Sequence, residues 1–197
     1  MQIQNNNELI LANFSDKPLI VKILTDTFKN DPCLNWLIEK ISNKNKLENI
    51  VNYVVDETLC TGSIFFTINK KAVVLWKTEN KEKFTFKFIK RNIIFLFQMG
   101  IKCVVKNLKM SNISHKHFPN NSKFYYLYMI GVLNEAQGNG LASKLMNPIL
   151  KYCNSENIPV FLETANPRNV EIYKKKGFVI IDTFNEENIS INYMRFN

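Results

Sequence analysis

The chain of 197 residues has few cysteines, and none of them is paired in close spacing. Cys33, Cys60, Cys103 and Cys153 stand far apart, in apolar or helical contexts. Neither a disulfide framework nor a clustered metal site is therefore expected, and we predict a reducing compartment and no metal.

The chain also lacks a long apolar run and a leader-like start. Residues 1–7 contain no basic region ahead of an apolar one. The stretch Ile93–Ile101 is apolar but much shorter than the ~20 residues of a membrane span. These absences predict a cytoplasmic protein without a signal peptide and without a membrane partner.

Acidic residues are the minority charge, because 17 Asp and Glu face 26 Lys and Arg, which gives a net charge of +9. Such an excess invites a nucleic-acid interpretation. The cations are spread over the whole chain, however, and no helix-turn-helix, RNA-binding or zinc signature accompanies them. A solvated basic surface is therefore favoured over a nucleic-acid partner. The length suits one domain with a substantial core, which we expect over residues 1–197.

The most informative stretch joins an apolar run to a glycine-rich turn and a helix. Residues 125–132 are aromatic and β-branched, which predicts a buried strand. Residues 137–142 read Gln-Gly-Asn-Gly-Leu-Ala, and apolar residues then recur at helical spacing to Ser155, across Pro148. A strand, a glycine turn and a helix form an anion-binding arrangement, because the first helical amides lack partners within the helix.

The spacing of this turn excludes two familiar phosphate loops. Ser143 stands where a Gly-x-Gly-x-x-Gly motif needs its third glycine, and no Gly-Lys-Ser/Thr run is present. The turn does fit Gln-x-x-Gly-x-Ala, a form of the motif whose backbone amides cradle the pyrophosphate of coenzyme A.

A second strand and a second helix follow at the positions this motif requires. Residues 159–164 read as a buried strand, and residues 166–178 read Asn-Pro-Arg-Asn-Val-Glu-Ile-Tyr-Lys-Lys-Lys-Gly-Phe, a short helix closed by glycine. Taken together, the ordered set from residue 132 to residue 178 resembles the GNAT superfamily of N-acetyltransferases.

Two upstream features resemble one branch of that superfamily. Phe-x-x-Asp-Pro at residues 28–32, followed by Trp36, and the pair Leu75-Trp76 are typical of GNATs related to puromycin N-acetyltransferase. From the residues alone, the first feature is equally a helix stop followed by a core tryptophan.

The resemblance implies an α/β (α+β) GNAT fold. This fold has a central, mixed but mostly antiparallel, twisted sheet of about seven strands, flanked by helices, with a splayed strand pair at the cofactor site. Periodicity predicts the other elements: an edge strand within residues 8–14, a helix capped by Ser15 and ending near Asn30, a helix over 47–59, a hairpin of strands 63–68 and 72–76, helices within 84–105, a polar loop over 111–122, and strands over 178–185 and 189–196.

The resemblance also implies acetyl-CoA as the cofactor and assigns residues to bind it. The backbones of Ile130 and Val132 would pair with the pantetheine arm, and each has an alternative role as ordinary core strand. Asn166 and Asn169 would contact pantetheine, although a residue before proline is also a common turn former. The pyrophosphate amides would come from the turn: Gln137, Gly138, Asn139, Gly140, Ala142 and Ser143.

Acyl transfer to an amine needs a proton acceptor for the amine and a proton donor for the departing thiolate. Tyr173 occupies the position of the family's proton-donating tyrosine, and a phenol with a pKa of about 10 stays protonated at neutral pH. Glu163 is a second catalytic candidate, since it ends a strand beside the expected cleft. Tyr126 stands where some GNATs carry a catalytic glutamate, and a neutral tyrosine is a poor base.

The sequence therefore leaves several candidates for the general base. Proton removal can run through water ordered by Tyr126, Tyr128 or Glu163, or it can use His115 or His117, whose ordinary pKa of about 6.5 suits the task. A loop histidine without a visible partner is more often simply solvated.

The predicted function is direct transfer of an acetyl group to a primary amine of a small molecule. A degenerate GNAT that holds coenzyme A without catalysis and a protein or peptide N-acetyltransferase are the alternatives. We expect a monomer or homodimer. The acceptor site is predicted over residues 31–36, 84–97 and 111–122, with Trp36, Tyr126 and Tyr128 as substrate contacts that favour an aromatic or apolar amine over a polyamine.

Overall fold

The protein is built on one seven-stranded sheet, described here from a computed structural model over residues 9–39, 44–78, 86–119, 122–186 and 188–197. The strand order is β1-β2-β3-β4-β5-β7-β6. Neighbouring strands pair antiparallel except for β4 and β5, which pair in parallel. The strands are β1 (Leu9–Leu11), β2 (Gly62–Thr67), β3 (Ala72–Thr78), β4 (Tyr125–Val132), β5 (Val160–Thr164), β6 (Val179–Glu186) and β7 (Ile189–Phe196). This mixed, mostly antiparallel sheet confirms the predicted fold class.

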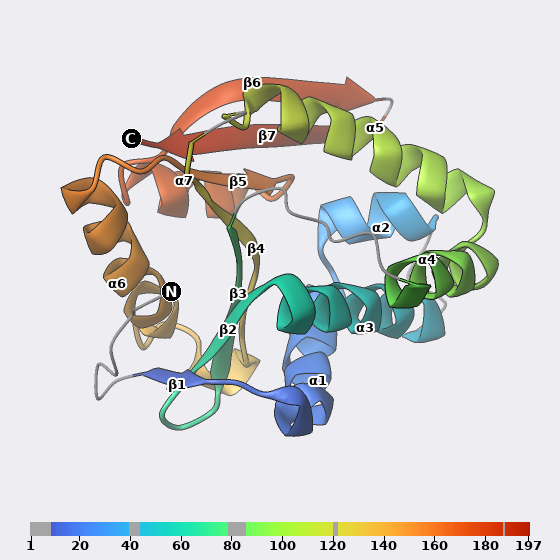
Figure 1. The fold of residues 1–197 in the computed structure, drawn as a ribbon. Helices are drawn as coiled ribbons and strands as arrows, with labels where there is room; N and C mark the ends of the chain where they lie inside the picture. The colour runs from blue at the N-terminus through green and yellow to red at the C-terminus, as the bar shows by residue number, and fades with distance from the viewer. Residues whose placement is uncertain (1–8, 40–43, 79–85, 120–121, 187) are drawn as a thin grey trace.

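Helices cover both faces of the sheet, because its strands carry apolar side chains on both sides. Figure 1 shows α6 on one side of the central strands, α1 and α3 on the other, and α5 running beside β6 and β7. The helices are α1 (Lys17–Phe28), α2 (Pro32–Ile38), α3 (Lys44–Thr61), α4 (Phe86–Met99), α5 (Ile101–His117), α6 (Leu141–Ser155) and α7 (Pro167–Lys174). None of the helices in the described ranges is long and apolar enough to cross a membrane.

A β-bulge in β4 changes which face its side chains meet. Trp76 of β3 pairs with Leu127, but its neighbour Leu75 pairs with Met129, so Tyr128 is an extra residue in β4. Before the bulge, Tyr126 lies on the α5 side of the sheet; after it, Ile130 packs with the α6 core. One strand therefore contributes even-numbered residues to two different faces.

The parallel pair β4 and β5 separates soon after it forms. Pairing covers only Tyr125 with Val160 and Tyr126 with Phe161, although β4 continues to Val132 and β5 to Thr164. The remaining edge of β4 faces an opening between the strands. This is the splayed pair that the resemblance predicts.

Two predicted local features are wrong. Ser15 does not cap the first long helix; it lies in a short 3-10 turn, Phe14–Asp16, that the Asn13 side chain caps. Residues 111–117 form the end of α5 and not a loop, because Cys103, Met110 and Ser114 on one side of this helix are buried against the protein. The helices expected within 84–105 are present as α4 and the start of α5, whereas Phe84 and the side chains of residues 86–92 lie outside the described part of the chain.

Candidate active site

A cavity of about 450 Å³, larger than a second one described below, lies where β4 and β5 separate. It is lined by residues of the glycine turn, the start of α6, α7, the end of α1 and the splayed end of β4. Most of the predicted cofactor residues line it: Ile130, Val132, Gln137, Gly138, Gly140, Ala142, Ser143, Asn166, Asn169 and Tyr173.

The glycine turn presents backbone amides to this cavity. Gly138 and Gly140 have φ angles of +82° and +70°, in the left-handed region that favours glycine. Gly140 is the N-cap of α6, and Lys144 is the first residue whose amide bonds back to its carbonyl, at 3.0 Å. No backbone acceptor is found within the described ranges for the amides of residues 138–143, so they are available to an anion at the positive end of the helix.

Asn139 is the one predicted turn residue that does not line the cavity with its neighbours. Its side-chain amide donates to the carbonyl of Ala136 at 3.3 Å. Asn139 therefore stabilises the turn that aims the glycine amides.

The start of α7 adds a charged and an amide side chain to the same cavity. The Asn166 side chain is the N-cap of α7 and accepts from the amide of Arg168 at 3.0 Å. Arg168 itself lines the cavity beside Asn169. Sequence reasoning did not single out Arg168, although an arginine between two asparagines at a helix start is a signal for anion contact.

The carbonyl of Val132 is already engaged by the protein. It accepts from the Gln137 side-chain amide at 3.3 Å and from the Thr27 hydroxyl at 3.4 Å. This arrangement ties the end of β4 to the glycine turn and to α1. The Gln137 side chain therefore serves to position the turn.

Tyr173 is buried in the wall of this larger cavity, against the ring of Phe178. Burial, with a smaller contribution from the nearby Asp31 carboxylate, raises the pKa of its phenol well above the ordinary value of 10. The hydroxyl therefore stays protonated at physiological pH, so it can serve as a proton donor but not as a base.

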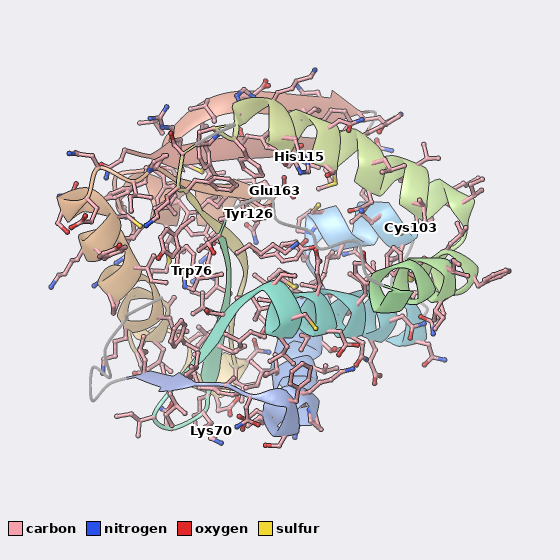
Figure 2. All side chains as sticks on the ribbon, in the orientation of Figure 1. Lys70, Trp76, Cys103, His115, Tyr126 and Glu163 are labelled. Atoms are coloured by element: carbon pink, nitrogen blue, oxygen red, sulfur yellow. The ribbon has the colours of Figure 1, made fainter. Side chains whose placement is uncertain are left out.

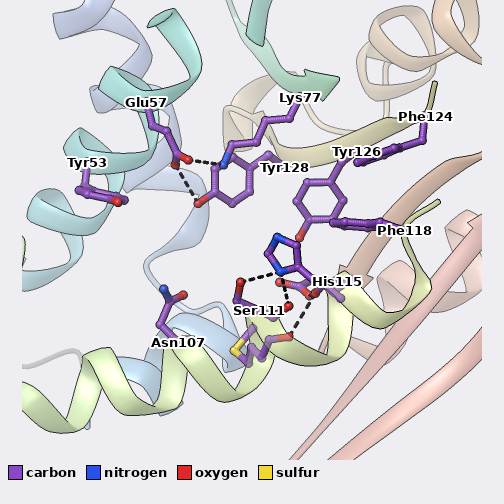
Figure 3. Close-up of a pocket in the computed structure, with 13 residues that line it drawn as sticks. Tyr53, Glu57, Lys77, Asn107, Ser111, His115, Phe118, Phe124, Tyr126 and Tyr128 are labelled. Atoms are coloured by element: carbon purple, nitrogen blue, oxygen red, sulfur yellow. Dashed lines mark hydrogen bonds and ion pairs between the residues drawn. The ribbon is translucent and has the colours of Figure 1, made fainter. Parts of the chain in front are cut away.

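The smaller cavity, of about 160 Å³, lies on the α5 side of the same two strands. Figure 3 shows aromatic rings of Tyr53, Phe118, Phe124, Tyr126 and Tyr128 around polar groups from α3, β3 and α5. Two carboxylates, Glu57 and Glu163, line it as well. The combination can hold an amine with an apolar body.

Glu163 is half-buried in this smaller cavity and bonded to hydroxyl groups. Its Oε2 accepts from the Ser114 hydroxyl at 2.8 Å, and Tyr126 is a second side-chain hydrogen-bond partner. Burial raises the pKa of Glu163, while the Ser114 and Tyr126 bonds act in the opposite direction. A carboxylate with a raised pKa is a stronger base than an exposed glutamate. Figure 2 shows Glu163, Tyr126 and His115 together between α5 and the sheet.

Glu57 has a different partner in the same cavity. Its Oε1 lies 2.6 Å from Nζ of Lys77, and the Tyr128 hydroxyl donates to its Oε2 at 3.4 Å. Nζ of Lys77 also lies 3.8 Å from the centre of the Tyr128 ring. Neither Glu57 nor Lys77 was predicted from the sequence, since they stand alone in α3 and β3 without a motif.

The two histidines of α5 face different sides of the helix. His115 lines the smaller cavity, with Nδ1 at 2.6 Å from the Ser111 carbonyl and its ring against Phe118. His117 points elsewhere, with Nε2 at 2.9 Å from the Asp182 carboxylate. Only His115 is therefore placed near Glu163.

Trp36 lines neither of these two cavities. Its ring packs edge-on against Phe184, and Nζ of Lys106 lies 4.9 Å from the ring centre and donates to its carbonyl at 2.8 Å. Trp36 thus joins α2 to β6 and α5.

Cys33 and Cys153 show no sign of nucleophilic activation. Burial, with the nearby carboxylates of Glu163 and Asp31, raises the pKa of Cys33 well above its ordinary value. Burial raises the pKa of Cys153 to about 12. Both thiols are therefore protonated at neutral pH, which favours direct transfer over an acyl-enzyme route.

Comparisons with known proteins agree with this geometry. A family model for the acetyltransferase (GNAT) domain matches residues 77–197, more than half of the chain. An uncharacterized N-acetyltransferase of Schizosaccharomyces pombe is 40% identical over 55 residues, which cover 28% of this chain and only 22% of that relative.

Solved structures share the fold at low sequence identity. A histone acetyltransferase-related protein of Corynebacterium glutamicum superposes with a TM-score of 0.69 at 19% identity, covering 95% of this chain and 94% of that one. Arylalkylamine N-acetyltransferase 2 of Aedes aegypti gives 0.65 at 16% identity, with 97% and 98% covered. The polyamine N-acetyltransferase of Drosophila melanogaster gives 0.62 at 10% identity, with 96% and 99% covered.

Proposed function

The chain belongs to the GNAT acetyltransferase domain family, and we propose that it transfers the acetyl group of acetyl-CoA directly to a primary amine of a small molecule. The observation that carries this proposal is the pair of cavities on β4 and β5. The larger is lined by free backbone amides at a helix start, and the smaller by a buried carboxylate among aromatic rings.

The residues of the larger cavity fit coenzyme A. The amides of residues 138–143, the positive end of α6 and the Arg168 side chain suit the pyrophosphate. The open edge of β4 at Ile130 and Val132, with Asn166 and Asn169 opposite, suits the amide-rich pantetheine arm. When bound, acetyl-CoA supplies the thioester from which the acetyl group is taken.

The proton transfers are assigned to one residue in each cavity. As the amine nitrogen bonds to the acetyl carbon, Glu163 accepts the amine proton, directly or through a water held with Tyr126. As the carbon–sulfur bond breaks, the Tyr173 hydroxyl donates a proton to the sulfur. The hydrogen bond from the Ser114 hydroxyl orients the Glu163 carboxylate for this proton transfer.

The acceptor class follows from the walls of the smaller cavity. Five aromatic rings and a volume of about 160 Å³ favour an amine on a compact aromatic or apolar body. The relation to the puromycin N-acetyltransferase branch belongs to the same proposal. It is supported by the Asp31-Pro32 pair, whose aspartate caps α2 through the amide of Leu34 at 3.0 Å.

An acetyltransferase assay with an amine panel tests the proposal. Release of free thiol from acetyl-CoA is measured with arylalkylamines, puromycin, amino acids, polyamines and peptide N-termini. Turnover that is highest with small aromatic amines supports the proposal. Preference for peptide N-termini would instead show that the acceptor is a peptide and not a small molecule. Coenzyme A binding without turnover of any amine would instead favour the degenerate, non-catalytic alternative.

A further inference from the structure

The smaller cavity contains a complete ammonium site that the protein's own lysine fills. Nζ of Lys77 lies 2.6 Å from the Glu57 carboxylate and 3.8 Å from the centre of the Tyr128 ring. A carboxylate and the face of an aromatic ring are the two groups that recognise a primary ammonium in proteins. The Glu57 side chain is only 6% exposed and that of Lys77 is 24% exposed, so the pair is largely removed from water.

The second carboxylate of the cavity, Glu163, is in a different position. Its hydrogen-bond partners are the hydroxyls of Ser114 and Tyr126, so no cation is bonded to it within the described part of the chain. Lys77 and His115 are near enough only to lower its pKa through space. The cavity therefore has two carboxylate sites for ammonium groups, one occupied from within and one open to an acceptor.

We propose that Lys77 determines acceptor specificity, because it occupies the second ammonium subsite, formed by Glu57 and Tyr128, and so restricts the cavity to acceptors with a single ammonium. This inference rests on the proposed function. A diamine or polyamine would bring a second ammonium beside Lys77, where the Glu57 carboxylate is already bonded to the lysine. Repulsion between two desolvated cations opposes such binding.

Removal of Lys77 should shift the acceptor preference from single amines towards diamines. In Lys77→Met the Glu57 carboxylate and the Tyr128 ring stay in place but lack a cation. The second ammonium of a diamine then takes the vacated subsite, while the first still reaches Glu163. A purely structural ion pair between β3 and α3 would predict a loss of stability and no change in which amines are acetylated.

The experiment compares matched acceptors on the full-length protein. The ratio of kcat/KM for an arylalkylamine with a second aminoalkyl group to kcat/KM for its single-amine counterpart is measured. We expect this ratio to rise by about tenfold or more in Lys77→Met, as for a newly formed buried charge pair. An unchanged ratio in a Lys77→Met protein that still acetylates the single amine would overturn the inference.

Two control variants separate the subsite from other effects of the substitution. Lys77→Arg keeps a cation beside Glu57 and should keep the wild-type ratio. Glu57→Gln/Lys77→Met removes both charges, so it relieves the repulsion by Lys77 but offers no carboxylate, and its gain for the diamine should be clearly smaller than that of Lys77→Met. A gain in the double variant equal to that of Lys77→Met would show that space and not the carboxylate was responsible, which would also overturn the inference.

A binding readout covers the case in which the variant is poorly folded or slow. Because Glu57 is uncompensated in Lys77→Met, the diamine should raise its Tm more than the single amine does, whereas wild type should show no such difference. Equal shifts in Lys77→Met contradict the inference. Failure of wild type to acetylate any amine would instead contradict the proposed function, so the two failures are distinguishable.

Discussion

The two cavities share the strands β4 and β5 but are built from different groups. The larger one offers mainly backbone groups, since the amides at the start of α6 and the open edge of β4 line it. The smaller one acts through side chains, with Glu163, Glu57, Lys77 and a set of aromatic rings. Backbone sites tolerate changes of side chain but not of conformation, whereas a side-chain site fails when one functional group is replaced.

This difference also fits the chemistry that we propose for each cavity. A pyrophosphate carries fixed charge and needs only well-aimed donors, which a glycine turn supplies. An acceptor amine must lose a proton and be distinguished from other amines. Those tasks require titratable groups in a low-dielectric setting, such as the half-buried Glu163.

Replacement of Glu163 should give the largest fall in kcat/KM. Glu163→Gln keeps the size of the side chain but removes the base, so kcat/KM for the amine should fall by roughly 10²–10⁴-fold. Affinity for coenzyme A, measured by calorimetry, should not change, because Glu163 lies in the smaller cavity. A variant with nearly full turnover would assign the base to another group, with His115 the next candidate to replace.

Replacement of the proton donor should have a somewhat smaller effect. Tyr173→Phe retains the ring that packs on Phe178 and loses only the hydroxyl, so kcat should fall by roughly 10²-fold with little change in coenzyme A affinity. Steady-state kinetics and a binding titration on the same preparation check both parts. Unchanged kcat would remove Tyr173 from the mechanism.

A substitution that disfavours the left-handed backbone of the glycine turn should lower the affinity for coenzyme A. Gly140→Val places a β-branched residue at φ +70°, which costs about 1–2 kcal/mol and should lower coenzyme A affinity by about tenfold. Gly100→Val is the matched control, since Gly100 has φ +80° and, like Gly140, has no atom within 4 Å of an added Cβ. The control should lose similar stability but keep its affinity for coenzyme A; equal losses of affinity would refute a specific role for the turn.

The pH dependence of kcat/KM should change when the hydrogen bond between Ser114 and Glu163 is removed. Burial raises the pKa of Glu163 above its ordinary value of 4.5, so kcat/KM should rise with pH through a midpoint above that value as the base form appears. The Ser114 hydroxyl lowers this pKa by bonding to the charged form. Ser114→Ala should therefore move the acid limb of the profile to higher pH, and a shift to lower pH would contradict this placement.

The sequence predicted the larger cavity far better than the smaller one. Most of its residues follow one another along β4, the glycine turn, α6 and α7, so a linear motif describes them. Glu57, Lys77 and Ser114 come from three separate elements, and only the packing of α3 and α5 against the sheet brings them together. No local pattern in a single sequence shows that.

The errors at the local level have equally physical causes. The polar composition of residues 111–117 suggested a loop, yet Ser114 is buried and bonded to Glu163, so tertiary contacts decide in favour of the helix. The role of Trp36 as an acceptor contact stays a prediction, but its ring packs on Phe184 and Lys106, which belong to β6 and α5 far along the chain. The bulge at Tyr128 depends on register with β3 and cannot be read from β4 alone.

The division between the two cavities is tested most directly by hydrogen exchange with and without coenzyme A. We expect slower exchange of the amides of residues 138–143 and around residues 166–173 when coenzyme A is added. Segments 111–117 of α5 and 53–57 of α3, which carry residues that line the smaller cavity, should exchange as before. Protection centred on these two helices, with none at the glycine turn, would contradict the assignment of the cavities.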